Sequence, residues 1–391
     1  MTRAIPPMLL VLVLWCAGLG SAAQFAKLGV VFDLLAAAYP GQSAAMLGLA
    51  ISIVGFVGLI FGTTAGLLVQ RLGYRRVLVG ALAAGALLSA LQAMLPPLPV
   101  LLGLRLAEGL SHLAIVVAAP VMIAQVAPPR QQGLAMTLWS SFFAVCFALV
   151  AWAGRPLAEA QGLGALLLAH AGYMAVFAGL LSWLMPRDVP QAPQPLSVGG
   201  LLRQHGHIYA SPRIAAPALG FFCYTVTYVA LLTLLPPLFG ARQAMVAAAF
   251  PLVSIAVSLT LGVWLLKKLP AVTIVQGGFA LAVLGAVVLW LFWAVPVVAL
   301  AGAFAIAAAL GLVQGASFAA IPQLNAAAAD RAGASGAVAQ LGNLGTTTGT
   351  PLLALLLAGQ GIGGLALFVL LPSALGIALH LWLSARRSTS P

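Results

Sequence analysis

Long apolar runs, cut by short stretches of glycine, proline and charged residues, make up most of this chain. Most runs are apolar on every side, which is typical of helices surrounded by lipid or by other helices. Each run is long enough to cross a hydrocarbon core of about 30 Å, and lipid offers a backbone no hydrogen-bond partner, so the crossing elements must be helices. The pattern predicts twelve membrane-spanning helices, at 7–35, 44–70, 76–95, 98–127, 133–154, 163–185, 214–239, 243–266, 270–294, 296–324, 334–358 and 362–384.

One long polar stretch divides these helices into two sets of six. Residues 186–213 are rich in proline and in polar and basic residues, which is typical of a linker. We therefore expect an N-terminal six-helix half over 1–185, a cytoplasmic linker over 186–213, and a C-terminal six-helix half with a short cytoplasmic tail over 214–391. The halves resemble each other weakly, which favours a repeat-built transporter.

Composition supports an all-α membrane protein. Of 391 residues, 63% are hydrophobic and 6% are charged, whereas soluble domains carry about 25% charged residues. The net charge is +12, but the basic residues stand singly or in pairs between apolar runs, so we expect no nucleic-acid partner. The three cysteines lie far apart in apolar runs, which predicts neither a disulfide framework nor a metal site, and no cofactor motif is present.

The basic residues also predict an orientation. If the N-terminus is cytoplasmic, 13 of the 17 lysines and arginines fall in cytoplasmic segments, as the positive-inside rule requires. Both termini are then cytoplasmic. The 13 residues are Arg3, Arg71, Arg75, Arg76, Arg130, Arg187, Arg203, Arg213, Lys267, Lys268, Arg331, Arg386 and Arg387.

The loop between the second and third predicted helices carries a recognisable motif. It reads G-L-L-V-Q-R-L-G-Y-R-R-V-L over 66–78 and resembles the signature loop of the major facilitator superfamily, G-x-L-a-D-r-x-G-r-(k/r)-x-x-l. We expect its glycines to permit a close helix contact and a tight turn, and its arginines to face lipid phosphates or helix C-termini. A gating role and simple membrane anchoring both stay open. The matching residues are Gly66, Arg71, Gly73, Arg75 and Arg76, while Gln70 replaces the usual aspartate.

The fourth predicted helix strengthens this resemblance. It begins L-L-G-L-R-L-A-E-G-L-S-H over 101–112, similar to the superfamily's helix 4 pattern l-x-x-x-R-x-x-q-G-x-g, with Glu108 in place of glutamine. The run M-T-L-W-S-S-F-F in helix 5 faintly resembles the cyanate and nitroimidazole permease branch, over a few residues only. With twelve spans in two halves, the likeness covers the whole chain and implies a secondary transporter that works by alternating access.

Charged residues inside predicted spans mark a candidate site. Arg105, Glu108 and His112 are spaced i, i+3 and i+7, so they share one helix face. Gln24 and Lys27 reach a similar depth on the first helix. Buried charges normally pair or face a wet cavity. Two cations and one carboxylate leave one positive charge unmatched, which favours an anionic substrate.

Three alternatives to this site stay open. Arg105 and Glu108 could form a purely structural ion pair, and His112 could be an ordinary packing residue. Lys27 could instead extend outward or pair with Asp33.

Coupling and further substrate contacts follow less directly. Glu108 is the only carboxylate placed deep in a span, and a proton is the coupling ion that needs just one, so we expect Glu108 with Arg105 to couple transport to protons. The resemblance implies that helices 1, 4, 7 and 10 line a central cavity, which makes Tyr224, Tyr228 and Gln314 substrate contacts.

These observations predict a proton-coupled symporter of a small, anionic solute, acting as a monomer in a bacterial inner membrane. There is no P-loop and no hydrolase motif, so we expect no enzyme activity. Efflux of apolar compounds or drugs is the alternative, although helix 5 lacks the G-P-x-x-G-G run of proton-driven drug antiporters. A non-transporting membrane sensor or assembly factor on the same fold is a remote third possibility.

Overall fold

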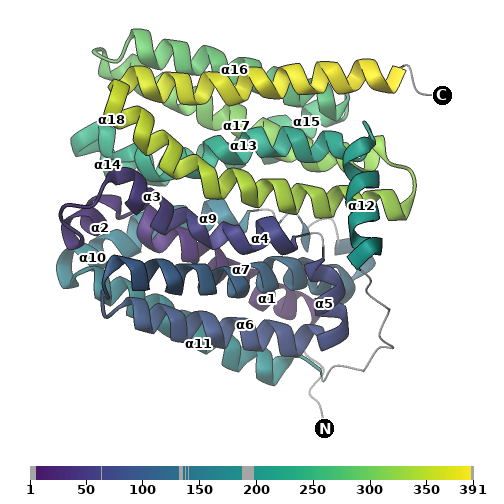
Figure 1. Cartoon of the computed structure of the whole chain (residues 1–391), viewed down its shortest axis with the longest axis horizontal. Helices are drawn as coiled ribbons and strands as arrows, with labels where there is room; N and C mark the ends of the chain where they lie inside the picture. Colours follow the sequence, from purple (N-terminus) through teal and green to yellow (C-terminus); the bar gives the residue numbers. More distant parts are fainter. Residues whose placement is uncertain are drawn as a thin grey trace. The chain divides into compact units, whose positions relative to one another are not determined.

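The structure, a computed structural model, describes residues 6–62, 64–131, 135–136, 138–139, 141–186 and 198–388. Every regular element in this part of the chain is helical (Figure 1). The side chain of Gln70 lies outside the described part, as do Arg3 and Arg187.

The described helices confirm the predicted all-helical membrane protein. Ten are long and apolar enough to cross a membrane, and two of these, Ala215–Leu266 and Asp330–Ser388, have 52 and 59 residues, enough for two crossings each. Each contains one glycine with non-helical angles, Gly240 (φ 54°, ψ −121°) and Gly361 (φ 54°, ψ −131°). Positive φ favours glycine, so each is a natural turning point. Figure 1 shows the ribbon of α18 (Ala328–Ser388) turning back on itself. Dividing each at its glycine gives twelve candidate spans in the described part of the chain.

The chain forms two compact units, of which unit 1 comprises Met1–Gln42, Ile53–Gly58 and Thr64–Gln194. Within it, α6 packs along α7 and α11, and α1 packs against α7, α9 and α11. Leu14, Leu82, Ile115 and Leu181 are fully buried in its core. Its helices are α1 (Pro7–Gly29), α2 (Phe32–Ala38), α5 (Ala65–Leu72), α6 (Tyr74–Gln92), α7 (Leu98–Val126), α9 (Phe142–Leu149), α10 (Arg155–Gln161) and α11 (Leu163–Leu184).

Two predicted helices of the first half are broken in the structure. The segment predicted as one helix over 7–35 ends at Gly29, and α2 begins separately at Phe32. The segment predicted over 44–70 consists of α3 (Ala44–Ser52), a 3₁₀ turn (Ile53–Gly55), α4 (Phe56–Phe61) and α5. Gly62 and Thr64 lie at the break before α5, and both are poor helix formers.

Unit 2 comprises Ser43–Ser52, Leu59–Thr63 and Pro195–Pro391. Within it, α13 packs along α18, while α16 packs against α17 and α18. Glycine allows this close packing: a methyl group added at Gly349 of α18 would collide with the backbone carbonyl of Val226 on α13. The remaining helices are α12 (Val198–Ala210), α13 (Ala215–Leu234), α14 (Gln243–Val257), α15 (Val263–Leu266), α16 (Ala271–Leu291) and α17 (Pro296–Leu324).

Helix α12 was not expected, because it lies within the segment predicted as a linker. Its Ile208 is buried against Ala218, Ile321 and Val338. The Tyr209 hydroxyl also donates a hydrogen bond to Gln340 Oε1 at 2.8 Å. Helix α12 is therefore part of the core of unit 2.

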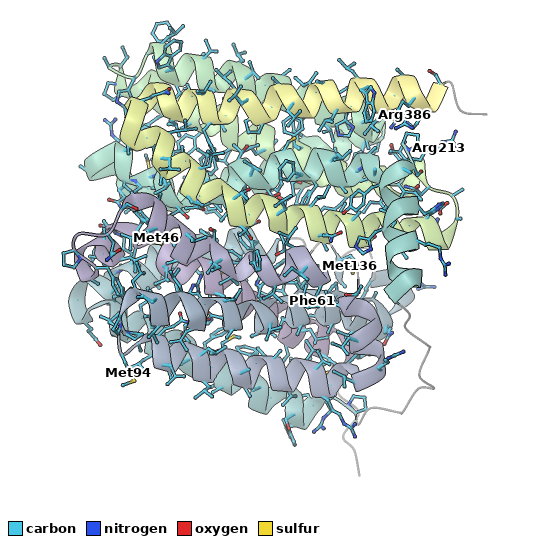
Figure 2. All side chains as sticks on the ribbon, in the orientation of Figure 1. Met46, Phe61, Met94, Met136, Arg213 and Arg386 are labelled. Carbon is cyan, nitrogen blue, oxygen red and sulfur yellow. The ribbon has the colours of Figure 1, made fainter. Side chains whose placement is uncertain are left out.

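Large apolar side chains cover the outer surfaces of the helices. Trp152 is 76% exposed and Trp183 75% exposed, and Leu87 and Leu110 are also largely exposed. Met94 points away from the helices of unit 1 (Figure 2). So much exposed apolar surface would be unfavourable in water and suits a protein surrounded by lipid.

Candidate functional site

Three charged residues meet in the interior of unit 1. Lys27 Nζ on α1 donates a hydrogen bond to Glu108 Oε1 at 2.6 Å, and Arg105 Nη1 on α7 donates to Glu108 Oε2 at 2.5 Å. All three residues are 0% exposed. Arg105 and Glu108 are one helical turn apart, so they meet on the same face of α7. The structure therefore brings together the two cations and the carboxylate that the sequence placed at similar depth.

Two residues of α6 complete the surroundings of this cluster. Gln92 Nε2 donates to Glu108 Oε2 at 2.9 Å. Ser89 Oγ accepts a hydrogen bond from Lys27 Nζ at 2.9 Å and donates to the Leu167 carbonyl at 2.8 Å. Both side chains are fully buried. Glu108 thus receives three donors, two of which carry a positive charge.

His170 of α11 also belongs to the site. Like Ser89 and Gln92, it was not predicted from the sequence. Its Nε2 lies 2.9 Å from the Gly20 carbonyl, and a carbonyl can only accept, so Nε2 carries a proton. In a neutral ring Nδ1 is then an acceptor, and Lys27 Nζ lies 3.3 Å from it. Ser89 Oγ lies 2.9 Å from Nδ1, so its one hydroxyl proton is donated either to Nδ1 or to the Leu167 carbonyl. A neutral His170 fits these partners without adding charge to the cluster.

Gln24 and His112 lie on the same two helices but bond elsewhere. Gln24 Nε2 donates to Ser111 Oγ at 2.9 Å, and Gly85 of α6 leaves room for this pair, because a Cβ there would lie 2.7 Å from Ser111 Oγ. His112 Nδ1 lies 2.9 Å from Ser21 Oγ. Neither residue hydrogen-bonds Glu108 in the described structure, so they form a neutral polar layer between α1 and α7.

The signature loop has the geometry that its turn requires. Gly73 ends α5 with a φ of 92°, a conformation that favours glycine. Arg75 Nη2 donates to the Ser182 carbonyl at 2.5 Å, near the C-terminal end of α11, as expected for an arginine at a helix C-terminus. Arg71 and Arg76 are exposed. The expected close contact at Gly66 was wrong for the described residues, because none comes within 4 Å of an added Cβ.

The predicted contacts of the second half lie in unit 2. Tyr224 and Tyr228 of α13 are buried and stacked, with ring centroids 5.0 Å apart and an interplanar angle of 24°. Phe221 extends this stack at 5.2 Å from Tyr224, and Phe250 of α14 lies 6.3 Å from Tyr228. Gln314 is half-buried on α17. These rings therefore form an aromatic row in the interior of unit 2.

A separate ion-pair cluster lies beyond the end of α1. Arg155 at the start of α10 donates to both carboxylate oxygens of Asp33 on α2, at 2.9 and 2.7 Å, and its Nε lies 2.8 Å from Glu159 Oε1. Asp33 therefore pairs with Arg155. The alternative that Lys27 pairs with Asp33 was wrong, because Lys27 is buried and bonded to Glu108.

This second cluster predicts a stability change in acid. Partial burial would raise the pKa of Asp33, but the hydrogen bonds and the charge of Arg155 outweigh it, and the pKa is lowered overall. A lowered pKa stabilises the folded state above the unfolded value of about 4, and this stabilisation is lost as pH falls through the folded value. Asp33 is partly exposed, so we expect a loss of about 1 kcal/mol or less.

Thermal unfolding between pH 7 and pH 3 measures this effect. Asp33→Asn should lower the melting temperature at pH 7 and lose less on acidification than the wild type. Glu159→Gln, which leaves the two bonds between Asp33 and Arg155 in place, is the matched control. If the melting temperatures of wild type and Asp33→Asn fell equally between pH 7 and pH 3, the loss of stability in acid would not come from Asp33.

Comparison with known proteins identifies the family. The family model described as Major Facilitator Superfamily matches residues 10–350. The chain belongs to the major facilitator superfamily. It is therefore a multi-pass membrane protein of a transporter family. In the described part of this transporter, no group of three or more His, Cys, Asp or Glu residues could hold a metal ion.

Individual relatives of this superfamily member are distant. The inner membrane transport protein YajR of Escherichia coli (strain K12) is 26% identical over 225 residues, which cover 56% of this chain and 49% of YajR. The match thus spans about half the length of that relative. A crystal structure of a bacterial homologue of the human lysosomal transporter Spinster, inward-facing and occupied, has a TM-score of 0.77 at 14% identity and 97% coverage of both chains. A D-xylose–proton symporter has a TM-score of 0.76 at 16% identity, again over 97% of both chains. These structural likenesses show the shared fold.

Proposed function

We propose that this transporter moves a small anion together with a proton, by alternating access, as a monomer in a bacterial inner membrane. One observation carries the proposal: Glu108 bonds Lys27 and Arg105 at once, in a fully buried cluster. Two cations and one carboxylate leave one positive charge in excess. The name of YajR supports the inner-membrane assignment.

The excess charge supports an anionic substrate. A buried charge without a counterion costs several kcal/mol unless a ligand or water compensates it. An anion that bonded Lys27 or Arg105 would supply the missing negative charge. It would also receive charge-assisted hydrogen bonds, which are about twice as strong as neutral ones. Gln24 and His112 are proposed to contribute neutral polar contacts beside it.

The same geometry supports proton coupling through Glu108 and Arg105. With both cations in place, the carboxylate form of Glu108 is stabilised. An anion that draws Arg105 away leaves Glu108 buried with one cation fewer, and burial then favours the protonated form. Anion and proton would therefore enter the cluster together, with no net change in its charge. That is symport in its simplest form.

The aromatic row of unit 2 supports a second candidate. Tyr224, Tyr228 and Gln314 are proposed as substrate contacts, and stacked aromatic rings suit an apolar or planar body. Efflux of an apolar compound would use this row without the charged cluster. The two candidates differ in whether transport depends on Lys27 and Arg105.

Topology gives a further prediction: the two termini and the linker at 186–213 are proposed to be cytoplasmic, with the signature loop acting as a gate on that side. Arg213 and Arg386 lie at the same end of unit 2 (Figure 2), and Arg387 Nη1 donates to the Pro212 carbonyl at 3.0 Å. Cysteines introduced in the linker should react with an impermeant maleimide only after cells are opened. Labelling of the linker in intact cells would show that the orientation is the opposite one.

Substrate charge is tested by a ligand panel. Thermal shift with acetate, lactate, succinate, nitrate and phosphate, each beside a neutral compound of similar size, should find a stabilising anion. Proteoliposome uptake should then rise with an imposed proton gradient. Lys27→Gln and Arg105→Gln should each weaken binding of that anion at least tenfold, since a charged hydrogen bond contributes about 1.5–3 kcal/mol.

Arg155→Gln is the matched control, because it removes a cation that bonds Asp33 instead of Glu108. Transport of a neutral compound that is unchanged in both cluster variants would refute the anion proposal and favour the second candidate.

A further inference from the structure

A cavity of about 210 Å³ inside unit 1 reaches the charged cluster from one side. It lies between α1, α9, α11 and the π-helical turn Val150–Gly154. Lys27 and His170 line its inner end. Most of its remaining wall is apolar and includes Leu19, Ala23, Leu149, Val150 and Leu166.

The cavity reaches the surface of unit 1. Two lining residues, Leu149 and Ala169, are exposed. Trp152 in the π-helical turn and Leu168 beside Ala169 are also exposed, and such apolar surface suits lipid. The π-helical turn follows α9 here, and single π turns in helices are frequent at functional sites. A ligand dissolved in the bilayer could therefore enter sideways, with its polar end foremost.

We propose that this cavity binds an aliphatic carboxylate, with the carboxylate accepting a hydrogen bond from Lys27 Nζ and the chain along the leucine and valine wall. This inference deepens the proposed function and rests on it, because Lys27 and the excess positive charge are the ones proposed there for the anion, but binding itself needs no proton gradient. His170 holds Lys27 in the empty cavity and gives up this contact when the ligand binds.

Charge complementarity favours a carboxylate over a neutral or cationic head group. The cluster next to the inner end holds one positive charge in excess, which an alcohol or amine of the same length would not compensate. The longest of the three Lys27 contacts, 3.3 Å, is the one to His170 Nδ1, and His170 also lines the cavity. A carboxylate oxygen could replace this contact while Lys27 keeps its bonds to Glu108 and Ser89.

The volume of the cavity limits how large the bound carboxylate can be. Pockets for drug-sized ligands measure about 300–1,000 Å³, and this cavity is smaller. A medium-length chain fits better than a two-chain phospholipid. Octanoate is a suitable probe, and octanol is its neutral control.

Binding is measured on the full chain in nanodiscs of zwitterionic lipid, with radiolabelled octanoate at pH 7.5. The wild type should bind octanoate at least ten times more tightly than octanol. Ala169→Trp closes the exposed mouth and should weaken octanoate binding at least tenfold. The matched control is Ala175→Trp on the same helix, at an exposed alanine outside the cavity, and it should stay within twofold of wild type.

The charged end is tested separately. Lys27→Gln should weaken octanoate binding at least tenfold and leave octanol binding within twofold, provided that its size-exclusion profile shows folded protein. Octanoate with a terminal diazirine should crosslink to the π-helical turn and α11. Equal binding of octanoate and octanol, equal effects of Ala169→Trp and Ala175→Trp, or crosslinks confined to other helices would each overturn the proposal. Because no gradient is applied, a failure of proton coupling leaves these results unaffected.

Discussion

Glu108→Gln is expected to abolish the accumulation of substrate driven by a proton gradient, while exchange of substrate across the membrane continues. Glutamine keeps the shape and can still accept a hydrogen bond from Lys27 or Arg105, but it has no proton to gain or lose. Without a titrating carboxylate, the anion could bind and cross, but no proton would move with it. The measurement compares gradient-driven uptake with counterflow in proteoliposomes, using the anion found in the ligand panel.

Counterflow also controls for folding, because exchange requires a folded transporter. Glu159→Gln is the matched variant, since it removes a carboxylate that, among the described residues, pairs with Arg155 and not with the cluster. We expect it to accumulate substrate as the wild type does. Full gradient-driven uptake by Glu108→Gln would show that the cluster has only a structural role. Wild-type uptake that does not depend on the gradient would show the same.

The charged core of the site could be predicted because ionised groups inside a span have few alternatives. Lys27, Arg105 and Glu108 are rare charges among apolar residues, and each must find a partner in the bundle. Ser89, Gln92 and His170 were missed because neutral polar side chains in membrane helices usually bond locally and leave no mark in the sequence. His170 had the clearest signal, as a titratable residue in the apolar helix α11.

Helix ends could be predicted where a glycine allows the chain to turn. They were harder to predict where packing between distant segments determines the end of the helix. The predicted breaks after residues 239 and 358 coincide with Gly240 and Gly361, both at positive φ. The π-helical turn at 150–154 and the burial of α12 depend on contacts between distant segments. Their local sequences resemble those of regular helices or of polar linkers, so local patterns could not find them.

A series of charge variants is expected to show which residue holds the cluster together. Glu108→Gln leaves Lys27 and Arg105 buried without a carboxylate, and breaking a buried pair in this way costs about 3–5 kcal/mol. Lys27→Gln leaves the Arg105–Glu108 pair, whose charges cancel, so it should cost less. The double variant holds one cation, as many excess charges as the wild type, and should be more stable than Glu108→Gln alone.

This order separates a charge effect from a packing effect. If the lost contacts merely filled space, the double variant would be the least stable of the three, with the two single losses adding. If unmatched charge dominates, removing Lys27 rescues Glu108→Gln, and the double variant loses less stability than the sum of the two single variants, whereas independent losses would give a coupling energy near zero. Thermal unfolding in detergent measures all four proteins. An added anion should raise the melting temperature of Glu108→Gln more than that of wild type, because that variant holds two uncompensated cations; an equal shift in both would argue against an anion site at this cluster.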